Sequence, residues 1–367
     1  MNPLMFYQIS FSRAYSLNTE WNVVFLRYAL LLKPHANVRY RQSLEKLARI
    51  ELECMLQAWG LEDAMVEIQE MAGEPFLTFA TDKMTPEAWQ EISRHSSVCL
   101  AAQVGEGDAL LPLRRNVQGV LPDDLPHVLK YKGKTNADFT YLMLHCAKAA
   151  SDFARVQAPL RVLDPMCGKA TTLFCAMCEG NGAVGIETDM KSLQEADTYY
   201  ARFLKLHRLK HKRSEQSRTL PKGGSVHSVT FEAAADAQAM KQGSTIALEL
   251  INGDAARAAE MVKPGSVHLI VSDLPYGVQH APKENGGMSA LTRLVRRVAP
   301  GCVKALKPGG ALAFSFNLNT LRRKDVEQAL AEAGLEVLTE GPYSDFSHWV
   351  EQAVDRDVVV ARKPSGK

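Results

Sequence analysis

The sequence has 367 residues, with 43 lysines and arginines against 41 aspartates and glutamates, which gives a formal net charge of +2. Hydrophobic residues make up 46% and charged residues 23% of the chain, proportions that are typical of soluble globular domains. These figures exclude a chain that is disordered throughout and a uniformly basic, histone-like protein, and the length favours two domains.

The sequence shows no signal for export or membrane insertion. The chain does not open on a basic segment followed by a long apolar one, and no apolar run approaches the roughly 18 residues of a membrane span. Seven cysteines, an odd number in a long chain, do not indicate a disulfide framework. We therefore expect a cytoplasmic protein with reduced thiols and no membrane partner.

Residues 1–128 predict a small α+β domain. One amphipathic helix is clear, because apolar residues recur at helical spacing from Leu44 to Trp59 and Gly60 is suited to end the helix. Prolines in the segment LPDDLPHVLK mark a connector to the rest of the chain. The other predicted elements are strands at 65–71, 76–80 and 98–104 and a helix that starts near Pro86.

Residues 129–367 alternate strand-like and helix-like segments, the pattern of an α/β domain with a parallel sheet. The seven predicted strands are 160–165, 183–187, 247–253, 267–273, 311–317, LEVLTEG and AVDRDVVVAR. The predicted helices are 138–153, 171–179, 190–206, 290–306 and 324–333. No helix separates the last two strands, so the final strand is expected to pair antiparallel, and residues 346–349 are expected to form an irregular loop.

The interval 207–245 is too long for a simple strand-to-helix connection. The segment from Lys205 to Lys222, which includes the start of this interval, contains seven basic residues and a single acid, Glu215. In a nucleic-acid enzyme such a segment contacts phosphates; elsewhere it is a solvated charged surface, and the sequence weighs the two equally. The residues assigned to phosphate contacts are Lys205, Arg208, Lys210, Lys212 and Arg213.

A ligand-binding turn is predicted where the strand ending at Asp164 meets the helix that begins at Thr171. The residues between them place backbone N–H groups and a helix N-terminus above the strand ends, where α/β proteins bind nucleotides. Lys169 and Ala170 depart from a G-x-G pattern, which would have a glycine at 170. The residues expected to bind a cofactor here are Asp164, Pro165, Cys167, Gly168 and Thr171.

Two further acids follow the next strands. Glu187 ends its strand about 20 residues later, where an acid can accept both hydroxyls of a ribose. Asp189 is better suited to cap the following helix. Asp254, with Ala255 beside it, follows the third strand, where its side chain is expected either to accept from an adenine amine or only to cap a helix.

The strongest chemical signal is Asp273-Leu274-Pro275-Tyr276-Gly277, at the end of the fourth strand. It resembles the Asp/Asn-Pro-Pro-Tyr/Phe signature of methyltransferases that modify planar exocyclic amines. The amine lone pair is delocalised into the ring, so an Asp side chain and a backbone carbonyl that accept its two N–H groups make the nitrogen a better nucleophile. Proline stiffens the loop and the tyrosine ring stacks a flipped-out base.

The cysteines offer no alternative site. Cys175 and Cys178 lie three residues apart on the helix that follows Cys167, and the four spaced ligands of a zinc site are missing. Small buried helix residues explain them better, so no metal is expected.

Together these motifs make the chain similar to class I S-adenosylmethionine-dependent methyltransferases, and more narrowly to tRNA guanosine N2-methyltransferases that act at or near position 10. A third passage, Tyr131-Lys132-Gly133-Lys134-Thr135-Asn136, carries this resemblance with the Asp164 and Asp273 motifs. The resemblance covers about residues 129–361. It implies a Rossmann-like fold, S-adenosylmethionine as cofactor, and Thr135, Asn136 or Phe139 beside the methionine part of that cofactor.

The resemblance also implies partners. Members of that family carry an N-terminal RNA-binding domain of the THUMP type, so residues 1–128 are expected to be THUMP-like or an unrelated module, and some members act with a small activating protein. The expected reaction is methylation of the guanosine N2 amine in tRNA. Methylation of guanine N2 in rRNA, methylation of an amine in DNA, and a catalytically silent RNA-binding protein are the alternatives.

Overall fold

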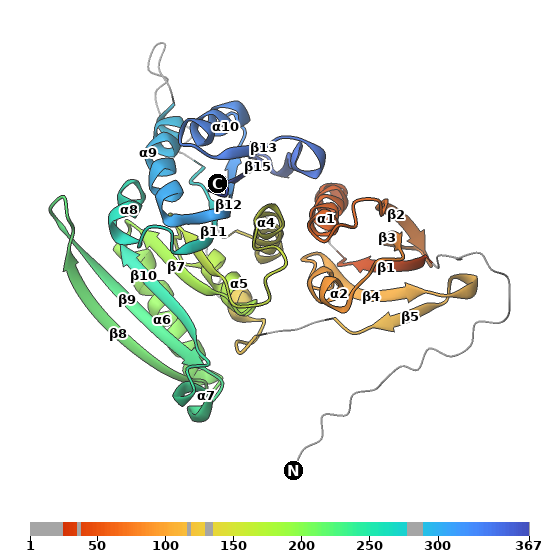
Figure 1. Ribbon diagram of the computed structural model, residues 1–367, viewed down its shortest axis with the longest axis horizontal. Coiled ribbons are helices and arrows are strands. Elements are labelled where there is room, and N and C mark those ends of the chain that lie inside the picture. The colour runs from red at the N-terminus through yellow and green to blue at the C-terminus, as the bar shows by residue number, and fades with distance from the viewer. Residues whose placement is uncertain (1–24, 35–37, 116–118, 129–134, 277–288, 367) are drawn as a thin grey trace.

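The computed structural model describes residues 25–34, 38–115, 119–128, 135–276 and 289–366 (Figure 1). Within these ranges the strands form two sheets, one of five strands and one of ten. The smaller sheet is built from the first third of the chain and the larger from the rest. Among the described residues, no helix is both long and apolar enough to cross a membrane.

The smaller sheet is antiparallel, in the order β2-β3-β1-β4-β5. Its strands are β1 (Leu26–Leu32), β2 (Glu67–Met71), β3 (Glu74–Thr81), β4 (Val98–Val104) and β5 (Leu110–Leu113), with helices α1 (Val38–Ala58) and α2 (Pro86–Ile92). The sequence did not predict β1 or β5. β1 is the central strand, and Ala29 and Leu30 on its opposite faces are both fully buried, so it lacks the polar and apolar alternation that identifies a half-exposed strand.

The larger sheet contains the predicted Rossmann-like core. Its strand order is β13-β15-β12-β11-β6-β7-β10, followed by β9 and β8 at one edge. Five adjacent strands, from β12 to β10, are parallel, and β15 is antiparallel to both neighbours, as predicted. The seven core strands are β6 (Arg161–Asp164), β7 (Gly182–Glu187), β10 (Ile246–Asn252), β11 (Val267–Asp273), β12 (Leu306–Asn317), β13 (Glu336–Leu338) and β15 (Val354–Arg362).

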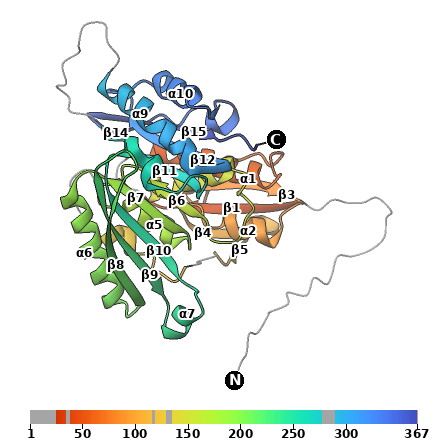
Figure 2. The ribbon, with the colours of Figure 1, turned by 60° about the vertical axis from the view of Figure 1, so that its left-hand side comes forward.

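The long interval 207–245 is structured, and the expected loop at 346–349 is in part a strand. The interval 207–245 forms a hairpin of β8 (Lys210–Thr219) and β9 (Ser225–Ala234), followed by α7 (Ala237–Lys241), and β9 extends the sheet beyond β10 (Figures 1 and 2). Its outer strand is polar on both faces, so it has no apolar alternation to detect. The expected loop 346–349 also includes the start of β14 (His348–Glu351), which pairs with β15.

Helices cover both faces of the larger sheet. One face packs against α4 (Ala137–Ala150), α5 (Thr171–Cys178) and α6 (Met190–Leu206). The other packs against α8 (Ala258–Met261), α9 (Ala290–Ala305) and α10 (Arg323–Glu332). A short helix, α3 (Leu125–Val128), lies on α5, where Leu121 and Leu125 join the core. Because the parallel strands are covered on both faces, most of their residues are apolar and they lack a strict alternation of polar and apolar side chains.

Helix α1 joins the two sheets (Figure 1). Ala48, Leu52 and Leu56 pack with the smaller sheet. Leu47 and Ile50, on its other side, pack with α4 and the strands of the larger sheet. One helix therefore contributes to two hydrophobic cores.

Candidate active site

The first part of the site is the turn between β6 and α5. Asp164 ends β6, is 2% exposed, and accepts hydrogen bonds from the Ser272 hydroxyl (2.7 Å) and the Met166 backbone N–H (3.0 Å). Burial raises the pKa of Asp164 to about 7, although these two donors act in the opposite direction. Pro165 is buried directly after it. The carboxylate therefore fixes the turn and links β6 to β11.

The backbone of this turn is open at Gly168. Gly168 and Ala170 have φ angles of +50° and +71°, in the left-handed region that is unfavourable for a residue with a Cβ. Among the described atoms, a Cβ built on Gly168 would meet nothing within 4 Å, so a ligand can approach the backbone there. Lys169 forms an ion pair with Glu195 of α6. Cys167 and Thr171, at the two sides of the turn, are buried.

Glu187, at the end of β7, lies against this turn. Its carboxylate accepts hydrogen bonds from the backbone N–H groups of Gly168 (2.9 Å) and Asp189 (2.8 Å). Asp189 caps α6, as predicted, and Asn252 donates to the carbonyl oxygens of Glu187 and Thr188 (3.0 Å each). The structure thus brings Gly168 and Glu187 together. Asn252 is a supporting residue that the sequence motifs did not identify.

Asp254 caps the short helix that begins at Ala255. One carboxylate oxygen accepts from the Ala256 backbone N–H (2.9 Å), and the other pairs with Arg297 of α9 (3.0 Å). Ala255 is buried beneath it. Of the two roles expected for Asp254, the structure displays the helix cap; a role in holding adenine stays a prediction.

The second part of the site surrounds Asp273, at the end of β11. Hydroxyl groups from three segments donate to its carboxylate: Thr135, Ser315 of β12, and Tyr276 (3.1 and 3.2 Å to the two oxygens). These three hydroxyl donors hold the Asp273 side chain in one position, and its carboxylate oxygens have lone pairs for further hydrogen bonds. Asp273 is therefore a preorganised acceptor at the carboxyl edge of the sheet.

The residues after Asp273 differ in exposure. The Leu274 side chain is 2% exposed, and its backbone N–H donates to the Ser315 carbonyl (2.9 Å). Pro275 is exposed, and the Tyr276 side chain is half-buried with its hydroxyl over Asp273. Burial raises the pKa of Tyr276 well above its usual value, so the hydroxyl remains a donor. Gly277 lies outside the described residues.

The passage before α4 reaches the same place from a distant part of the chain. Thr135 donates to Asp273, 138 residues away in sequence. Asn136 caps α4 by accepting from the Asp138 backbone N–H (2.8 Å). Residues 131–134 of this motif lie outside the described ranges. The segment expected to hold the cofactor thus begins in direct contact with the Asp273 motif.

Sequence reasoning missed Arg356 of β15. Its side chain is 5% exposed, its Nε donates to the Tyr276 hydroxyl (2.7 Å), and its guanidinium lies over the rings of Phe139 (4.4 Å) and Tyr276 (5.6 Å). Arg356 stands between Asp355 and Asp357 at the polar start of β15, so nothing in the sequence marked its side chain as buried. Its partner could not be named without knowing how β15 is placed.

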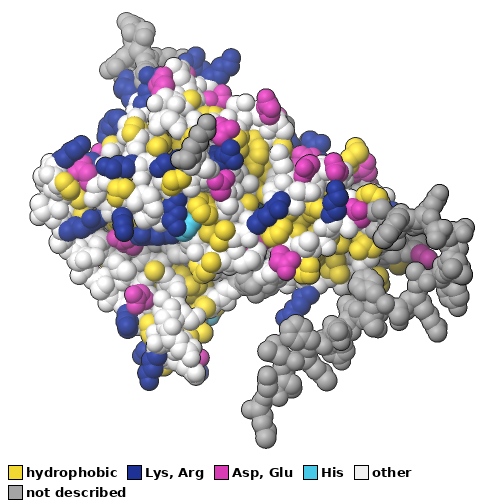
Figure 3. All heavy atoms as spheres, in the orientation of Figure 1, with side chains coloured by type: hydrophobic (Ala, Val, Ile, Leu, Met, Phe, Trp, Pro, Cys, Tyr) yellow, Lys and Arg dark blue, Asp and Glu magenta, His cyan; other side chains and the backbone are white. Residues whose placement is uncertain are grey.

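The basic residues assigned to phosphate contacts lie at the other edge of the sheet. Lys210 pairs with Ala234, and Ala233 pairs with Ile246 at the amino end of β10, whereas the Asp164 and Asp273 motifs lie at carboxyl ends. Arg213 is bonded to Asp197 (2.7 and 2.8 Å). Figure 3 shows Lys and Arg side chains over the side of the molecule where this hairpin lies. These residues therefore do not line the turn or the Asp273 motif.

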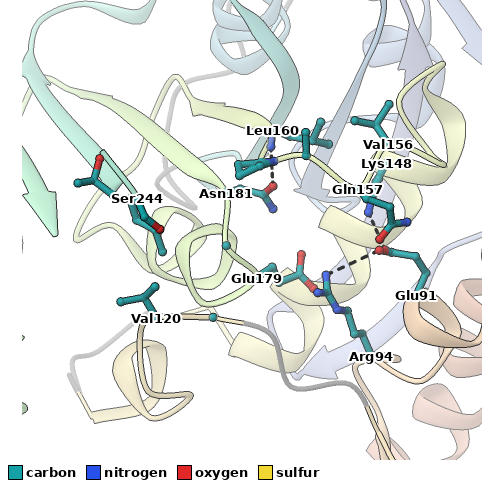
Figure 4. A pocket seen from close by; sticks show the side chains of 16 residues that line it. Glu91, Arg94, Val120, Lys148, Val156, Gln157, Leu160, Glu179, Asn181 and Ser244 are labelled. Carbon is teal, nitrogen blue, oxygen red and sulfur yellow. Dashed lines mark hydrogen bonds and ion pairs between the residues drawn. The ribbon is translucent and has the colours of Figure 1, made fainter. Parts of the chain in front are cut away.

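A groove of about 270 Å³ also lies away from the motifs (Figure 4). It is lined by Leu160 and Ile246, at the amino ends of β6 and β10, and by Glu91, whose carboxylate bonds Lys148 (2.6 Å). Because α/β sheets bind ligands at their carboxyl ends, this groove is not the candidate active site.

Comparison with known families identifies the larger domain. Residues 139–340 match the model of a family described as "RMKL-like, methyltransferase domain". The match spans more than half of the chain and includes both the Asp164 turn and the Asp273 motif. It confirms the methyltransferase resemblance seen in the sequence. No curated protein sequence matches this chain.

Solved structures with a similar arrangement include three methyltransferases or homologues. TrmN from Thermus thermophilus is 16% identical, with 91% of this chain and 81% of that chain covered and a TM-score of 0.40. A methyltransferase homolog protein from Pyrococcus horikoshii is 12% identical, with 93% and 87% covered and a TM-score of 0.37. A TehB-like SAM-dependent methyltransferase from Corynebacterium glutamicum is 14% identical, with 57% and 83% covered and a TM-score of 0.33.

Proposed function

The chain belongs to the RMKL-like methyltransferase family, and we propose that it transfers a methyl group from S-adenosylmethionine to the N2 amine of a guanosine in tRNA. The observation that carries this proposal is the Asp273 carboxylate, held by three hydroxyl donors beside Tyr276 at the end of β11. An exocyclic amine needs acceptors of this kind, since both of its N–H groups donate.

Asp273 and the Leu274 carbonyl would accept the two N–H groups of the target amine. Accepting both directs the nitrogen lone pair out of the base plane, which makes the nitrogen a better nucleophile. Pro275 fixes the loop and Tyr276 provides the aromatic surface on which the flipped base stacks. As the new C–N bond forms, the nitrogen must lose one proton, and the Asp273 carboxylate, whose main role would be to orient the amine, could also accept that proton.

The residues of the Asp164 turn fit the cofactor. When bound, S-adenosylmethionine supplies an electrophilic methyl group on a sulfonium sulfur and leaves as S-adenosylhomocysteine. The open backbone at Gly168 and the adjoining Glu187 carboxylate form a cradle suited to a nucleoside, because Glu187 has acceptor capacity beyond its two backbone bonds. Thr135 and Asn136 complete this proposed site on the side of Asp273.

We assign recognition of the RNA to the first 128 residues and to basic residues of the hairpin. The N-terminal part would act as a THUMP-like RNA-binding domain, with the catalytic domain over residues 129–367. Because Lys210 and Lys212 lie at the edge opposite the motifs, they would contact phosphates far from the target nucleotide. A small activating protein belongs to the same proposal.

Transfer of tritiated methyl groups to separated tRNA, rRNA and DNA, with analysis of the labelled nucleoside, tests the proposal. We expect N2-methylguanosine from tRNA. Label in another RNA, in DNA or on another base would replace the proposed substrate. No label in any pool, together with no calorimetric binding of S-adenosylmethionine at millimolar concentration, would favour a silent RNA-binding protein.

Asp273→Ala should abolish methyl transfer while leaving the affinity for S-adenosylmethionine within about twofold, because Asp273 faces the amine and not the Gly168 turn. Loss of both activity and cofactor affinity would move Asp273 into the cofactor site. Full turnover would show that it does not orient the amine.

The distant phosphate contacts predict a different phenotype. Lys210→Glu with Lys212→Glu should raise KM for full-length tRNA and lower the salt dependence of binding, with kcat unchanged, because each lost phosphate contact removes about 0.9 from the slope. An unchanged salt slope would leave these lysines as a solvated surface.

A further inference from the structure

We propose that Arg356 is a positioning residue for the Tyr276 ring, and through it for the amine acceptor Asp273. This assignment rests on the proposed function, since it gives a role to a residue behind the amine-binding motif. Two consecutive hydrogen bonds connect the three residues. Arg356 Nε donates to the Tyr276 hydroxyl oxygen (2.7 Å), and that hydroxyl donates to Asp273 (3.1 Å).

The placement of Arg356 follows from the sheet. β15 runs antiparallel to β12, so it begins at the edge where β11 and β12 end. Arg356 pairs there with Asn317, two residues after Ser315, whose hydroxyl donates to Asp273. Two neighbouring strands thus support the motif, one directly at Asp273 and one through Tyr276.

Burying the Arg356 guanidinium is energetically unfavourable unless other groups replace its hydration. Its side chain is 5% exposed, and no carboxylate among the described residues forms an ion pair with it. Removing a guanidinium from water is unfavourable unless charged or polar partners replace the water. Here the compensation comes from the Tyr276 oxygen and from two aromatic faces.

Phe139 makes the arrangement rigid. Its ring is 3% exposed on α4 and lies 4.4 Å from the guanidinium carbon of Arg356. Thr135, which donates to Asp273, is four residues earlier in the chain. The segment that enters α4 therefore supports both ends of the chain of contacts from Arg356 to Asp273.

Tyr276 needs such an anchor. Pro275, the residue before it, is exposed, and among the described residues the hydrogen bonds of the Tyr276 hydroxyl are those with Asp273 and Arg356. A tyrosine whose hydroxyl is held at one end presents its ring in one orientation, which is the requirement for stacking a flipped base. Arg356 supplies that fixed end.

The test combines kinetics with a spectroscopic measurement. Arg356→Met should lower kcat for RNA methylation at least tenfold and raise KM for RNA, with cofactor affinity within twofold of wild type. Arg356→Lys, which keeps the charge but not the planar donor, should have a kcat between those of wild type and Arg356→Met. Arg362→Met is the matched control, because Arg362 is on the same strand but pairs with Glu336 (2.8 Å).

Coupling to the Tyr276 hydroxyl separates positioning from a general effect on stability. In a Tyr276→Phe background, Arg356→Met should cost less than threefold in kcat, because the atom that accepts its hydrogen bond is already gone. Equal losses in both backgrounds, or full activity of Arg356→Met, would overturn the proposal. Thermal unfolding of each variant shows whether it folds. If Arg356→Met does not fold, the same comparison is made with Arg356→Lys.

Fluorine NMR of protein labelled with 3-fluorotyrosine reads the contact without any reaction. The Tyr276 resonance, identified by its loss in Tyr276→Phe, should shift in Arg356→Met and Arg356→Lys but not in Arg362→Met. An unmoved resonance would overturn the anchoring. If wild-type protein methylates no nucleic acid, the proposed function fails, and this measurement still decides whether Arg356 holds Tyr276.

Discussion

At the scale of single residues, the site is made of side chains that each hold the next. Ser272 donates to Asp164, Ser315 donates to Asp273, and Arg356 donates to Tyr276. None of these supporting residues belongs to the turn or the loop that would touch a ligand, yet each fixes the position of one that does. Few residues would therefore touch a ligand, and a larger number of residues hold those few in position.

Leu274 illustrates how a departure from the usual motif can be structural. The resemblance would place a proline there, but the Leu274 N–H donates to the Ser315 carbonyl (2.9 Å). Leu274→Pro should therefore lower the free energy of unfolding by about 1–3 kcal/mol, the cost of leaving a buried acceptor without its donor. Urea denaturation measures this, with Leu274→Met, which keeps the N–H, as control. Equal stability of the proline variant would contradict it.

At the scale of elements, the hairpin of β8 and β9 is part of the larger domain's core. Phe231 of β9 is fully buried, and its ring meets that of Tyr200 of α6 edge to face at 5.0 Å. β8, in contrast, presents charged and polar side chains to solvent. One strand of the basic segment therefore stabilises the fold, and the other covers the sheet edge.

Phe231→Ala should lower the free energy of unfolding by about 3–5 kcal/mol, because it leaves a cavity between α6 and the sheet. Glu232→Ala is the matched control: the next residue points to the other face and is half exposed, 4.0 Å from Lys212. Denaturant titration of both variants checks the difference. A small effect of Phe231→Ala would mean that the hairpin is dispensable for the core.

At the scale of the whole molecule, His145 links the two sheets. Its ring nitrogens lie 2.6 Å from Glu51 of α1 and 2.5 Å from Glu179 after α5. Burial alone would lower the pKa of His145, but these two carboxylates raise it to about 10. Glu51 is likewise buried, yet His95 and His145 hold its pKa at about 2. A charged imidazolium thus joins the N-terminal α+β part to the catalytic domain.

The raised pKa sets the pH dependence of this link. Its contribution to stability is fully present below pH 6.5, the ordinary histidine value, and is lost as pH rises toward 10. His145→Gln should cost about 3–5 kcal/mol near pH 6, because it leaves two buried carboxylates uncompensated, and less toward pH 10. Unfolding measured across this range tests the trend. His207→Gln, a partly exposed histidine 3.8 Å from Asp124, is the control.

Short segments of the sequence were sufficient to predict the parallel core strands and the motifs at the ends of those strands. Asp164, Glu187 and Asp273 each follow a buried strand directly, and carboxyl ends of parallel strands meet at one edge. The cap at Asp189 was equally local. The family match agrees with the methyltransferase interpretation, whereas the role of each residue stays a prediction.

Tertiary structure alone decided what depends on register and on distant contacts. Thr135 meets Asp273 across 138 residues, and Arg356 reaches Tyr276 only because β15 is antiparallel to β12. The basic cluster was visible in the sequence, but only the pairing of the strands places Lys210 and Lys212 at the edge opposite the motifs. The sequence by itself determined the parallel core strands and the turns at their ends, because those depend on neighbouring residues, but it did not determine β1, β5, β8, β9 or β14. The fold decided which side chains share a site, because that depends on how strands pair.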